Sequence, residues 1–308
     1  MYRSLVVPLD GSTFAEQVLP IAGAIAQQSK ALVTLVRVHR PLGYGDDAPA
    51  EQWDGDVREW EREYLMRAAE SLSERYGAKV ETRLLEEPVV GALCDYVRAH
   101  GIDLVLISTH GRTGVSRAWL GSVADGIVRQ ASSPVLMLRA RADASPSDRG
   151  DGDHLFNRVL LPLDGSRLSE TIVGHAVRLA RTFGSEIVLV RVVEPVIARG
   201  PEYPLSSPIP MTLVDRDTTE RLKEVARKYL DEFAHRLRDE HGLQATFEVR
   251  MFESAAPAII DAAASRHASV VAMSTHGRGA SRLFVGSVAD KVLRGGPRAV
   301  LLFRPSQE

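Results

Sequence analysis

The sequence predicts an α/β protein built from two tandem doubly wound domains. Short apolar segments rich in Val and Leu alternate with longer amphipathic segments, and the order repeats at about half the length of the 308-residue chain. Such alternation is typical of a mainly parallel sheet with helices on both faces. A chain of this length exceeds the usual size of one core. We therefore expect two domains, residues 1–140 and 157–308, joined by a polar linker over 141–156.

Five segments of the first half have the composition of buried strands bounded by turn residues. They are Ser4–Leu9, Leu32–Val38, Val80–Leu85, Leu104–Ser108 and Val135–Leu138. The amphipathic segments between them are long enough for crossover helices, at Thr13–Gln28, Asp56–Tyr76, Val89–His100 and Ser122–Ala131. Strand and helix thus alternate throughout, as a parallel sheet requires.

The same order returns in the second half. Strands are expected at Arg158–Leu163, Ile187–Val193, Thr246–Met251, Val270–Ser274 and Val300–Phe303, and helices at Leu168–Phe183, Leu213–His241, Ala255–Arg266 and Ser287–Leu293. The segment 194–211 is rich in proline, which opposes helix and sheet alike. We expect a surface excursion there, and a lid, a partner-binding segment and an idle loop are all open alternatives.

Composition narrows the classes of partner and location. A net charge of −2 gives no reason to expect binding to nucleic acid or to an anionic membrane. No stretch approaches the roughly 20 apolar residues of a membrane span, and the apolar run at the N-terminus is too short for a signal peptide. The single cysteine, Cys94, rules out an intramolecular disulfide and favours a cytoplasmic protein. We expect Cys94 to be a small buried hydrophobe.

Two short motifs occur once in each half. Pro-Leu-Asp-Gly-Ser ends the first strand, at 8–12 and at 162–166, and a glycine-containing loop follows the fourth strand, at 110–122 and at 276–287. In doubly wound sheets, ligands bind beyond the carboxyl ends of the strands. If the first and fourth strands are neighbours in the sheet, the two motifs share one crevice in each half.

The loop of the first half is a candidate phosphate-binding site. Gly111, Gly114 and Gly121 let backbone amides approach an anion, and the helix beginning at Gly121 and Ser122 adds free N–H groups and its positive dipole end. Ser122 offers a hydroxyl, and Arg112 is a candidate phosphate contact with a solvated surface arginine as the alternative. A simple helix N-cap is the alternative for Gly121 and Ser122. The loop has no P-loop pattern.

Asp10 and Asp164 close the first strand of each half. They are either turn formers and helix caps, or carboxylates that accept hydrogen bonds from a ligand or hold Mg²⁺ through water. The sequence identifies no orienting partner for His110 or His276, so we expect structural histidines there and no catalytic residue.

Two long segments carry a family resemblance in addition to the strand ending VVPLDGS. They read DLVLISTHGRTGVSRAWLGSVADGIVRQASSPVLMLR and SVVAMSTHGRGASRLFVGSVADKVLRGGPRAVLLFR. Together these sequences resemble the universal stress protein family over nearly the whole chain, in two copies. The resemblance implies a five-stranded parallel sheet of order 3-2-1-4-5 in each half, with dimerisation through the last strand.

The resemblance also implies an ATP site, because ATP-binding members carry the loop pattern G-x2-G-x9-G-[ST]. The first half keeps the spacing with serine in place of the first glycine, whereas the second half is also one residue shorter. The corresponding positions are Ser108, Gly111, Gly121 and Ser122 in the first half and Ser274, Gly277, Gly286 and Ser287 in the second.

Other site positions follow from the same resemblance. Asp10 and Asp164 take the position of a ligand-contacting aspartate, and Val38 and Val192 the position of a backbone contact to adenine. The first site is therefore the better candidate for ATP, with or without Mg²⁺.

Three functions are consistent with these residues. The first is an ATP-binding stress-response protein that acts through ligand-dependent conformation or partner binding, without turnover. The alternatives are a slow Mg²⁺-dependent ATP hydrolase and a dimeric scaffold with vestigial sites. Tandem copies also predict that the halves pair as a pseudo-dimer through the edges at 135–138 and 300–303, with a homodimer of chains as a further alternative.

Overall fold

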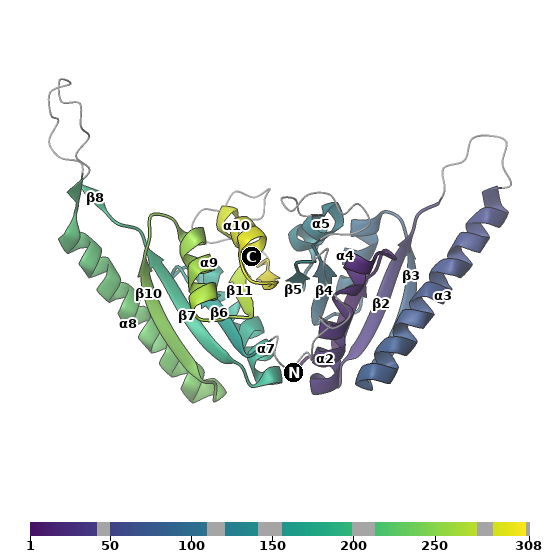
Figure 1. The fold of residues 1–308 in the computed structure, drawn as a ribbon, viewed down its shortest axis with the longest axis horizontal. Helices are drawn as coiled ribbons and strands as arrows, with labels where there is room; N and C mark the ends of the chain where they lie inside the picture. The colour runs from purple at the N-terminus through teal and green to yellow at the C-terminus, as the bar shows by residue number, and fades with distance from the viewer. Residues whose placement is uncertain (42–49, 110–120, 141–155, 199–212, 276–285, 306–308) are drawn as a thin grey trace, which may run out of the picture.

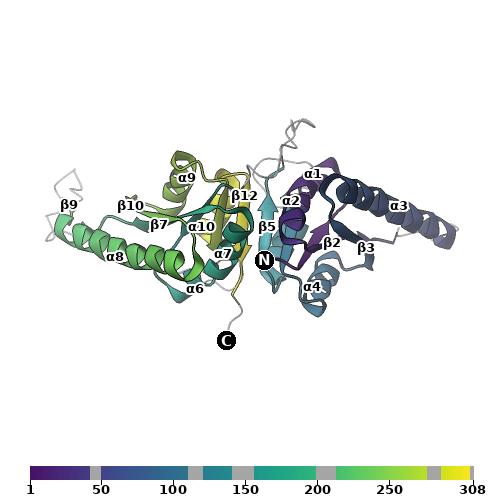
Figure 2. The same ribbon diagram turned by 90° about the horizontal axis from the view of Figure 1, so that it is seen from below.

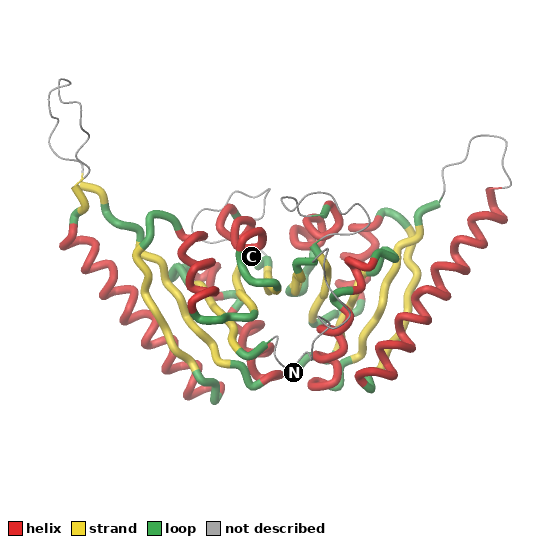
Figure 3. Tube along the Cα trace, in the orientation of Figure 1, coloured by secondary structure: helices red, strands yellow, loops and turns green. Residues whose placement is uncertain are grey.

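The computed structural model describes residues 1–41, 50–109, 121–140, 156–198, 213–275 and 286–305 (Figure 1). Within them, helices lie on both sides of a continuous layer of strands (Figure 3). The predicted α/β class, with two doubly wound units in tandem, is confirmed.

The strands of the first half are β1 (Ser4–Pro8), β2 (Leu32–His39), β3 (Lys79–Glu86), β4 (Leu104–Ser108) and β5 (Val135–Leu138). Its helices are α1 (Thr13–Glu16), α2 (Leu19–Ser29), α3 (Ala50–Tyr76), α4 (Val89–Ala99) and α5 (Ser122–Gln130). The second half has strands β6 (Arg158–Pro162), β7 (Glu186–Val193), β10 (Ala245–Met251), β11 (Val270–Ser274) and β12 (Ala299–Phe303). Its helices are α6 (Arg167–Glu170), α7 (Val173–Phe183), α8 (Arg216–His241), α9 (Ala255–Ser265) and α10 (Ser287–Gly295).

One ten-stranded sheet runs through both halves in the order β10-β7-β6-β11-β12-β5-β4-β1-β2-β3. Numbered within each half, this is the predicted order 3-2-1-4-5 in both copies, and every pair within a half is parallel. At the centre, β5 and β12 pair antiparallel, with Leu138 opposite Ala299 and Val135 opposite Leu302. The predicted pairing of the two halves through their last strands is therefore present.

Apolar residues on the two faces of the sheet form two buried cores. Leu5 and Val7 of β1 belong to the core under α2, α3, α7 and α8, whereas Val6 belongs to the core under α4, α5, α9 and α10. This alternation follows from the two-residue period of a strand. Seen from below, the long helices α3 and α8 lie toward the two ends of the molecule (Figure 2).

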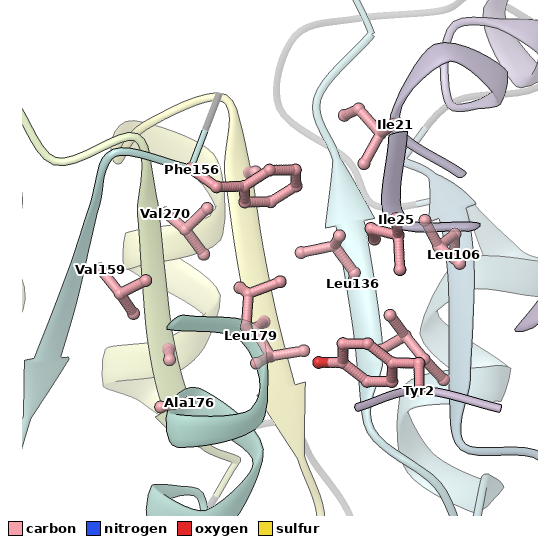
Figure 4. Close-up of a cluster of buried hydrophobic side chains, with 14 of the residues drawn as sticks. Tyr2, Ile21, Ile25, Leu106, Leu136, Phe156, Val159, Ala176, Leu179 and Val270 are labelled. Atoms are coloured by element: carbon pink, nitrogen blue, oxygen red, sulfur yellow. The ribbon is translucent and has the colours of Figure 1, made fainter. Parts of the chain in front are cut away.

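Both cores continue from one half into the other. In Figure 4, Tyr2, Ile25 and Leu136 of the first half face Phe156 and Leu179 of the second, and all five are fully buried. Near this contact, Arg178 on α7 donates to Asp103 at 2.8 Å. Burial by itself raises the pKa of Asp103. The backbone N–H of Arg3 and the guanidinium of Arg178 stabilise the carboxylate more strongly, so the pKa of Asp103 lies below its usual value.

Four predicted helices differ from the observed elements. The helix expected over 56–76 already begins at Ala50, and the helix expected over 168–183 is broken into α6 and α7. The helix expected over 13–28 is broken into α1 and α2, and Pro20 lies in the first turn of α2, where the missing proline N–H costs no helical hydrogen bond. The helix expected from Leu213 begins at Arg216 instead, because Asp215 caps α8 by accepting from the Thr218 N–H at 3.0 Å. Residues Leu213–Val214 form β9, which pairs with β8 (Ile197–Ala198).

Some expected segments have no described counterpart. Residues 199–211 of the proline-rich segment lie outside the described residues, and so do residues 141–155 of the linker expected over 141–156. The last linker residue, Phe156, is fully buried and stacks on Phe183 at 4.4 Å between ring centroids. The domain boundaries stay a prediction.

Candidate functional site

A pocket of about 890 Å³ opens beyond the carboxyl ends of β1, β2 and β4 in the first half. These strands are neighbours in the sheet, so residues far apart in the chain meet there. Five of the sequence-predicted site residues line this one pocket: Asp10, Val38, Ser108, Gly121 and Ser122. This is the crevice that a doubly wound sheet offers to a ligand.

Asp10 is a turn former, which is one of the two roles that the sequence left open. Its Oδ1 accepts from the backbone N–H of Ser12 at 2.9 Å and from the Ser12 hydroxyl at 2.6 Å, which closes a tight turn. The turn needs Gly11 at φ +82°, a conformation that favours glycine. Ser12 in turn caps α1 by accepting from the Ala15 N–H at 3.1 Å. Asp10 is therefore a turn former whose carboxylate also lines the pocket.

Gly121 closes the loop that leaves β4. Its backbone N–H donates to the carbonyl of Thr109 at 2.9 Å, so this amide is not available to an anion. A Cβ added to Gly121 would lie 3.1 Å from the same carbonyl oxygen, which explains glycine at this position. The helix α5 starts directly afterwards without a side-chain cap. Its first free N–H groups, in the turn from Ser122, face no helical acceptor and belong to residues of the pocket wall.

Ser108 ends β4 with a buried hydroxyl. The residue is 6% exposed, and its Oγ has no hydrogen-bond partner among the described residues. It lines the pocket at the position where the ATP-binding pattern has glycine. A buried hydroxyl without a partner costs on the order of 1–3 kcal/mol.

A buried charged network forms another wall of the pocket. Arg37 on β2 donates from Nε to Glu61 on α3 at 2.8 Å, and the second oxygen of Glu61 contacts His39 Nδ1 at 2.8 Å. The other ring nitrogen of His39 lies 2.9 Å from Asp54. His39 can donate to both carboxylates only in its doubly protonated form. The network ties α3 to the end of β2.

The network continues toward the surface and toward α1. Arg58 donates to Asp54 at 2.8 Å, and this hydrogen bond lowers the pKa of Asp54. On the inner side, the Tyr64 hydroxyl donates to Glu16 at 3.0 Å, and burial together with Glu16 raises the pKa of Tyr64. The guanidinium of Arg37 lies between these groups, 5.1 Å from the ring centroid of Trp60.

Comparison with known proteins agrees with this architecture. A model of the universal stress protein family matches residues 1–139 and again residues 155–304. The chain belongs to the universal stress protein family. A curated universal stress protein of Mycolicibacterium smegmatis is 26% identical over 313 residues, covering 98% of this chain and 97% of that protein.

Solved structures share the fold over the full length of this universal stress protein. The structure of a universal stress protein from Archaeoglobus fulgidus superimposes with a TM-score of 0.70 at 18% identity, covering 98% of each chain. A putative universal stress protein from Pseudomonas aeruginosa gives a TM-score of 0.60 at 18% identity, covering 99% of this chain and 94% of that one.

The second half of this universal stress protein repeats the backbone of the site. Asp164 accepts from the Ser166 N–H at 2.8 Å beside Gly165, whose φ is +81°. The N–H of Gly286 donates to the Thr275 carbonyl at 2.8 Å, as Gly121 does to Thr109 in the first half. The remaining predicted residues Val192, Ser274 and Ser287 lie in β7, at the end of β11 and at the start of α10.

The side chains around these second-half positions differ. Arg191 takes the position of Arg37, and Tyr229 donates to Glu170 at 2.7 Å as Tyr64 does to Glu16. Glu61 lies three residues before Tyr64, and the residue three positions before Tyr229 is the buried Ala226, which therefore takes the position of Glu61. In β2 the sequence after Arg37 is Val38 and His39, whereas in β7 the sequence after Arg191 is Val192 and Val193. Val193 therefore takes the position of His39. The duplicated fold therefore carries the Glu61 and His39 contacts only in its first copy.

Several predicted residues lie outside the described part of the chain. These are Gly111, Arg112, Gly114, Gly277 and the two histidines His110 and His276.

Cys94 is described, and it is buried as predicted, with burial raising the pKa of its thiol. No helix in the described ranges is long and apolar enough to span a membrane. Those ranges also contain no group of three or more His, Cys, Asp or Glu side chains that could hold a metal ion.

Sequence reasoning missed Arg37, His39 and Glu61. A signal was present, because Arg37 and His39 interrupt the apolar strand LVTLVRVH, where a charged side chain must find buried partners. Their partner Glu61 is not identifiable from the sequence, since it lies among the many charged residues of α3.

Proposed function

We propose that the pocket of the first half binds an adenine nucleotide, with ATP as the ligand, and that this universal stress protein acts through nucleotide-dependent conformation or partner binding. The observation that carries the proposal is that Asp10, Val38, Ser108, Gly121 and Ser122 line one pocket. A carboxylate, a strand end and the start of a helix then surround the same ligand.

The chemistry of the two ends of the pocket supports a nucleotide. The start of α5 offers backbone N–H groups and the positive end of its dipole, which suit phosphate groups. Asp10 offers a hydrogen-bond acceptor for a hydroxyl or amine at the end of β1. We expect Mg²⁺ to enter with the triphosphate, since this ion usually binds through substrate phosphates.

We propose binding without turnover, in the cytoplasm. The carboxylate of Asp10 is engaged by Ser12, and both oxygens of Glu61 are engaged by Arg37 and His39. Neither is therefore an evident general base for a water molecule. Phosphate release that exceeds the buffer background and falls with Asp10→Ala supports the ATP hydrolase instead.

A thermal-shift experiment with a pair of matched variants tests the site. Gly121→Val places side-chain atoms against the Thr109 carbonyl and the pocket wall, so we expect it to abolish the rise in Tm caused by ATP. Gly286→Val makes the same change at the same turn of the second half and serves as the control. An ATP-induced rise in Tm that survives Gly121→Val and disappears with Gly286→Val places binding in the second half and contradicts the proposal.

A further inference from the structure

Arg37 contributes a buried guanidinium to the wall of the first-half pocket. Its side chain is 5% exposed, and Nε donates to Glu61 at 2.8 Å. Within the described part of the chain, Nη1 is buried and has no hydrogen-bond partner. A buried charged donor that lacks an acceptor is rare in proteins and calls for an explanation, of which a ligand is one.

The described network leaves Nη1 of Arg37 without an acceptor. Glu61 offers two oxygens, of which Oε1 accepts from Arg37 Nε and Oε2 contacts His39. The rings of Trp60 and Tyr64 lie 5.1 and 5.6 Å from Cζ, so they hold the guanidinium in place without accepting a conventional hydrogen bond. The charge of Arg37 is balanced by Glu61, yet one of its donors remains for a ligand.

The sheet order places Arg37 away from the proposed phosphate end. Strand β1 separates β2, which carries Arg37, from β4, which leads toward α5. Adjacent strands are about 4.8 Å apart, so the ends of β2 and β4 are separated by roughly 10 Å. A nucleotide whose phosphates lie at the start of α5 therefore extends its sugar and base across Asp10 toward Arg37.

We propose that Arg37 is a ligand-contacting residue and that its Nη1 donates to an acceptor atom on the ribose or base of the bound nucleotide. This inference rests on the proposed function, because it assigns an orientation to the ligand of the same pocket. Glu61 and His39 are then positioning residues that hold the guanidinium at one angle. The acceptor is a hydroxyl oxygen or a ring nitrogen of the nucleoside.

The second half provides the internal comparison. Arg191 occupies the same strand position as Arg37, but Ala226 stands in place of Glu61. Its guanidinium packs beside Gly165, since a Cβ built there would lie 3.0 Å from Nη1 of Arg191. The arginine is therefore present in both copies, whereas the carboxylate that orients Arg37 belongs to the first.

Tryptophan fluorescence can test the contact in the first half alone. All three tryptophans, Trp53, Trp60 and Trp119, belong to the first half, and Trp60 lines the pocket. In a Trp53→Phe/Trp119→Phe background, the full-length chain is titrated with AMP and with ATP, and the midpoint of the Trp60 signal gives Kd. We expect Arg37→Met to weaken both nucleotides by the same factor, about ten- to a hundredfold.

Two further variants complete the experiment. Arg191→Met makes the same change in the second half, and we expect it to leave the Kd read from Trp60 unchanged. Arg37→Lys keeps the charge and the stem but lacks the planar fork, and it replaces Arg37→Met if that variant does not fold. We expect it also to weaken AMP and ATP equally.

The outcomes separate this inference from the proposed function. If the parent binds nucleotide and the Arg37 variants bind it equally well, Arg37 is not a ligand contact and only the inference fails. If Arg37→Met weakens ATP much more than AMP, Arg37 contacts the phosphates and the assigned orientation is wrong. If the parent shows no saturable binding of either nucleotide, the proposed function fails and the inference fails with it.

Discussion

At the scale of single residues, the pocket contains polar atoms that the described protein does not satisfy. The hydroxyl of Ser108 and Nη1 of Arg37 are both buried without a partner in the described part of the chain. Both residues line the same pocket. Ser108 is the residue that departs from the glycine of the ATP-binding pattern, so its hydroxyl changes what the pocket offers to a ligand.

The stability of a Ser108→Ala variant tests whether the buried hydroxyl lacks a partner. Since Ser108→Ala removes a buried hydroxyl that lacks a partner, we expect the free energy of unfolding of the ligand-free protein to rise by up to about 1 kcal/mol, measured in urea. The matched change Ser274→Ala affects a serine that is engaged in an interaction, and we expect it to lower stability. A loss of stability in Ser108→Ala equal to that in Ser274→Ala contradicts this interpretation.

At the scale of elements, the charged network anchors α3 to the end of β2. Glu61 is the shared partner of Arg37 and His39, and its side chain is 5% exposed. Removing one partner of a buried ionic group is costly because it leaves the remaining charge without compensation. The second half reaches the same packing with Ala226 and Val193, so the fold itself does not need the network.

Glu61→Ala is therefore expected to be strongly destabilising. We expect the free energy of unfolding to fall by about 3–5 kcal/mol in denaturant titrations. Glu59→Ala is the control on the same helix, because the Glu59 side chain is 64% exposed and its contact with Arg62 is 3.5 Å long. Its effect should stay within about 0.5 kcal/mol. Equal effects of the two changes would argue against a structural role for the network.

The same elements explain what the sequence could and could not predict. The strands and the crevice beyond their carboxyl ends follow from local pattern and from the rules of parallel sheets. The order 3-2-1-4-5, which makes the strands that end at Asp10 and Ser108 neighbours, is implied only by the family resemblance. The break at Pro20 and the start of α8 at Arg216 depend on backbone hydrogen bonding that periodicity does not report. The Arg37 contact with Glu61 joins residues 24 positions apart, and only the packing of α3 on β2 brings them together.

At the scale of the whole molecule, the two halves form one structural unit. They share a ten-stranded sheet, and both buried cores contain residues of both halves. Arg139 strengthens the junction by donating to the carbonyls of Arg294 and Gly296 at 2.7 Å each. Because the last strands β5 and β12 pair with each other, the edge implied for family dimers is used within the chain.

This shared core predicts a single unfolding transition. Tryptophan fluorescence reports only the first half, since all three tryptophans lie there, whereas circular dichroism at 222 nm reports the helices of both halves. We expect the two denaturation curves to coincide. A fluorescence transition displaced from the circular dichroism transition would show that the halves unfold independently.

The junction also predicts a dependence of stability on pH. His175 on α7 lies against Phe303, with ring centroids 4.3 Å apart, and burial together with the charge of Arg178 lowers the pKa of His175 to about 4. Between pH 6.5 and pH 4 the unfolded chain binds this proton and the folded chain does not, so the stability present above pH 6.5 is lost as the pH falls. After allowing for partial exposure of the ring, the loss is about 1–2 kcal/mol.

Histidine variants isolate this contribution. We expect His175→Phe to reduce the fall in the free energy of unfolding between pH 6.5 and pH 4, measured by urea titration at each pH. His235→Gln, at a histidine whose side chain is 58% exposed, is the control. A pH profile of His175→Phe that is identical to that of the parent contradicts the assignment.

The central claim is that the first-half pocket binds an adenine nucleotide, and isothermal titration of the full-length chain with ATP tests it most directly. The account predicts saturable binding with heat of association, lost in Gly121→Val and retained in Gly286→Val. No heat of binding at millimolar ATP, from protein freed of any ligand that co-purifies, would contradict it.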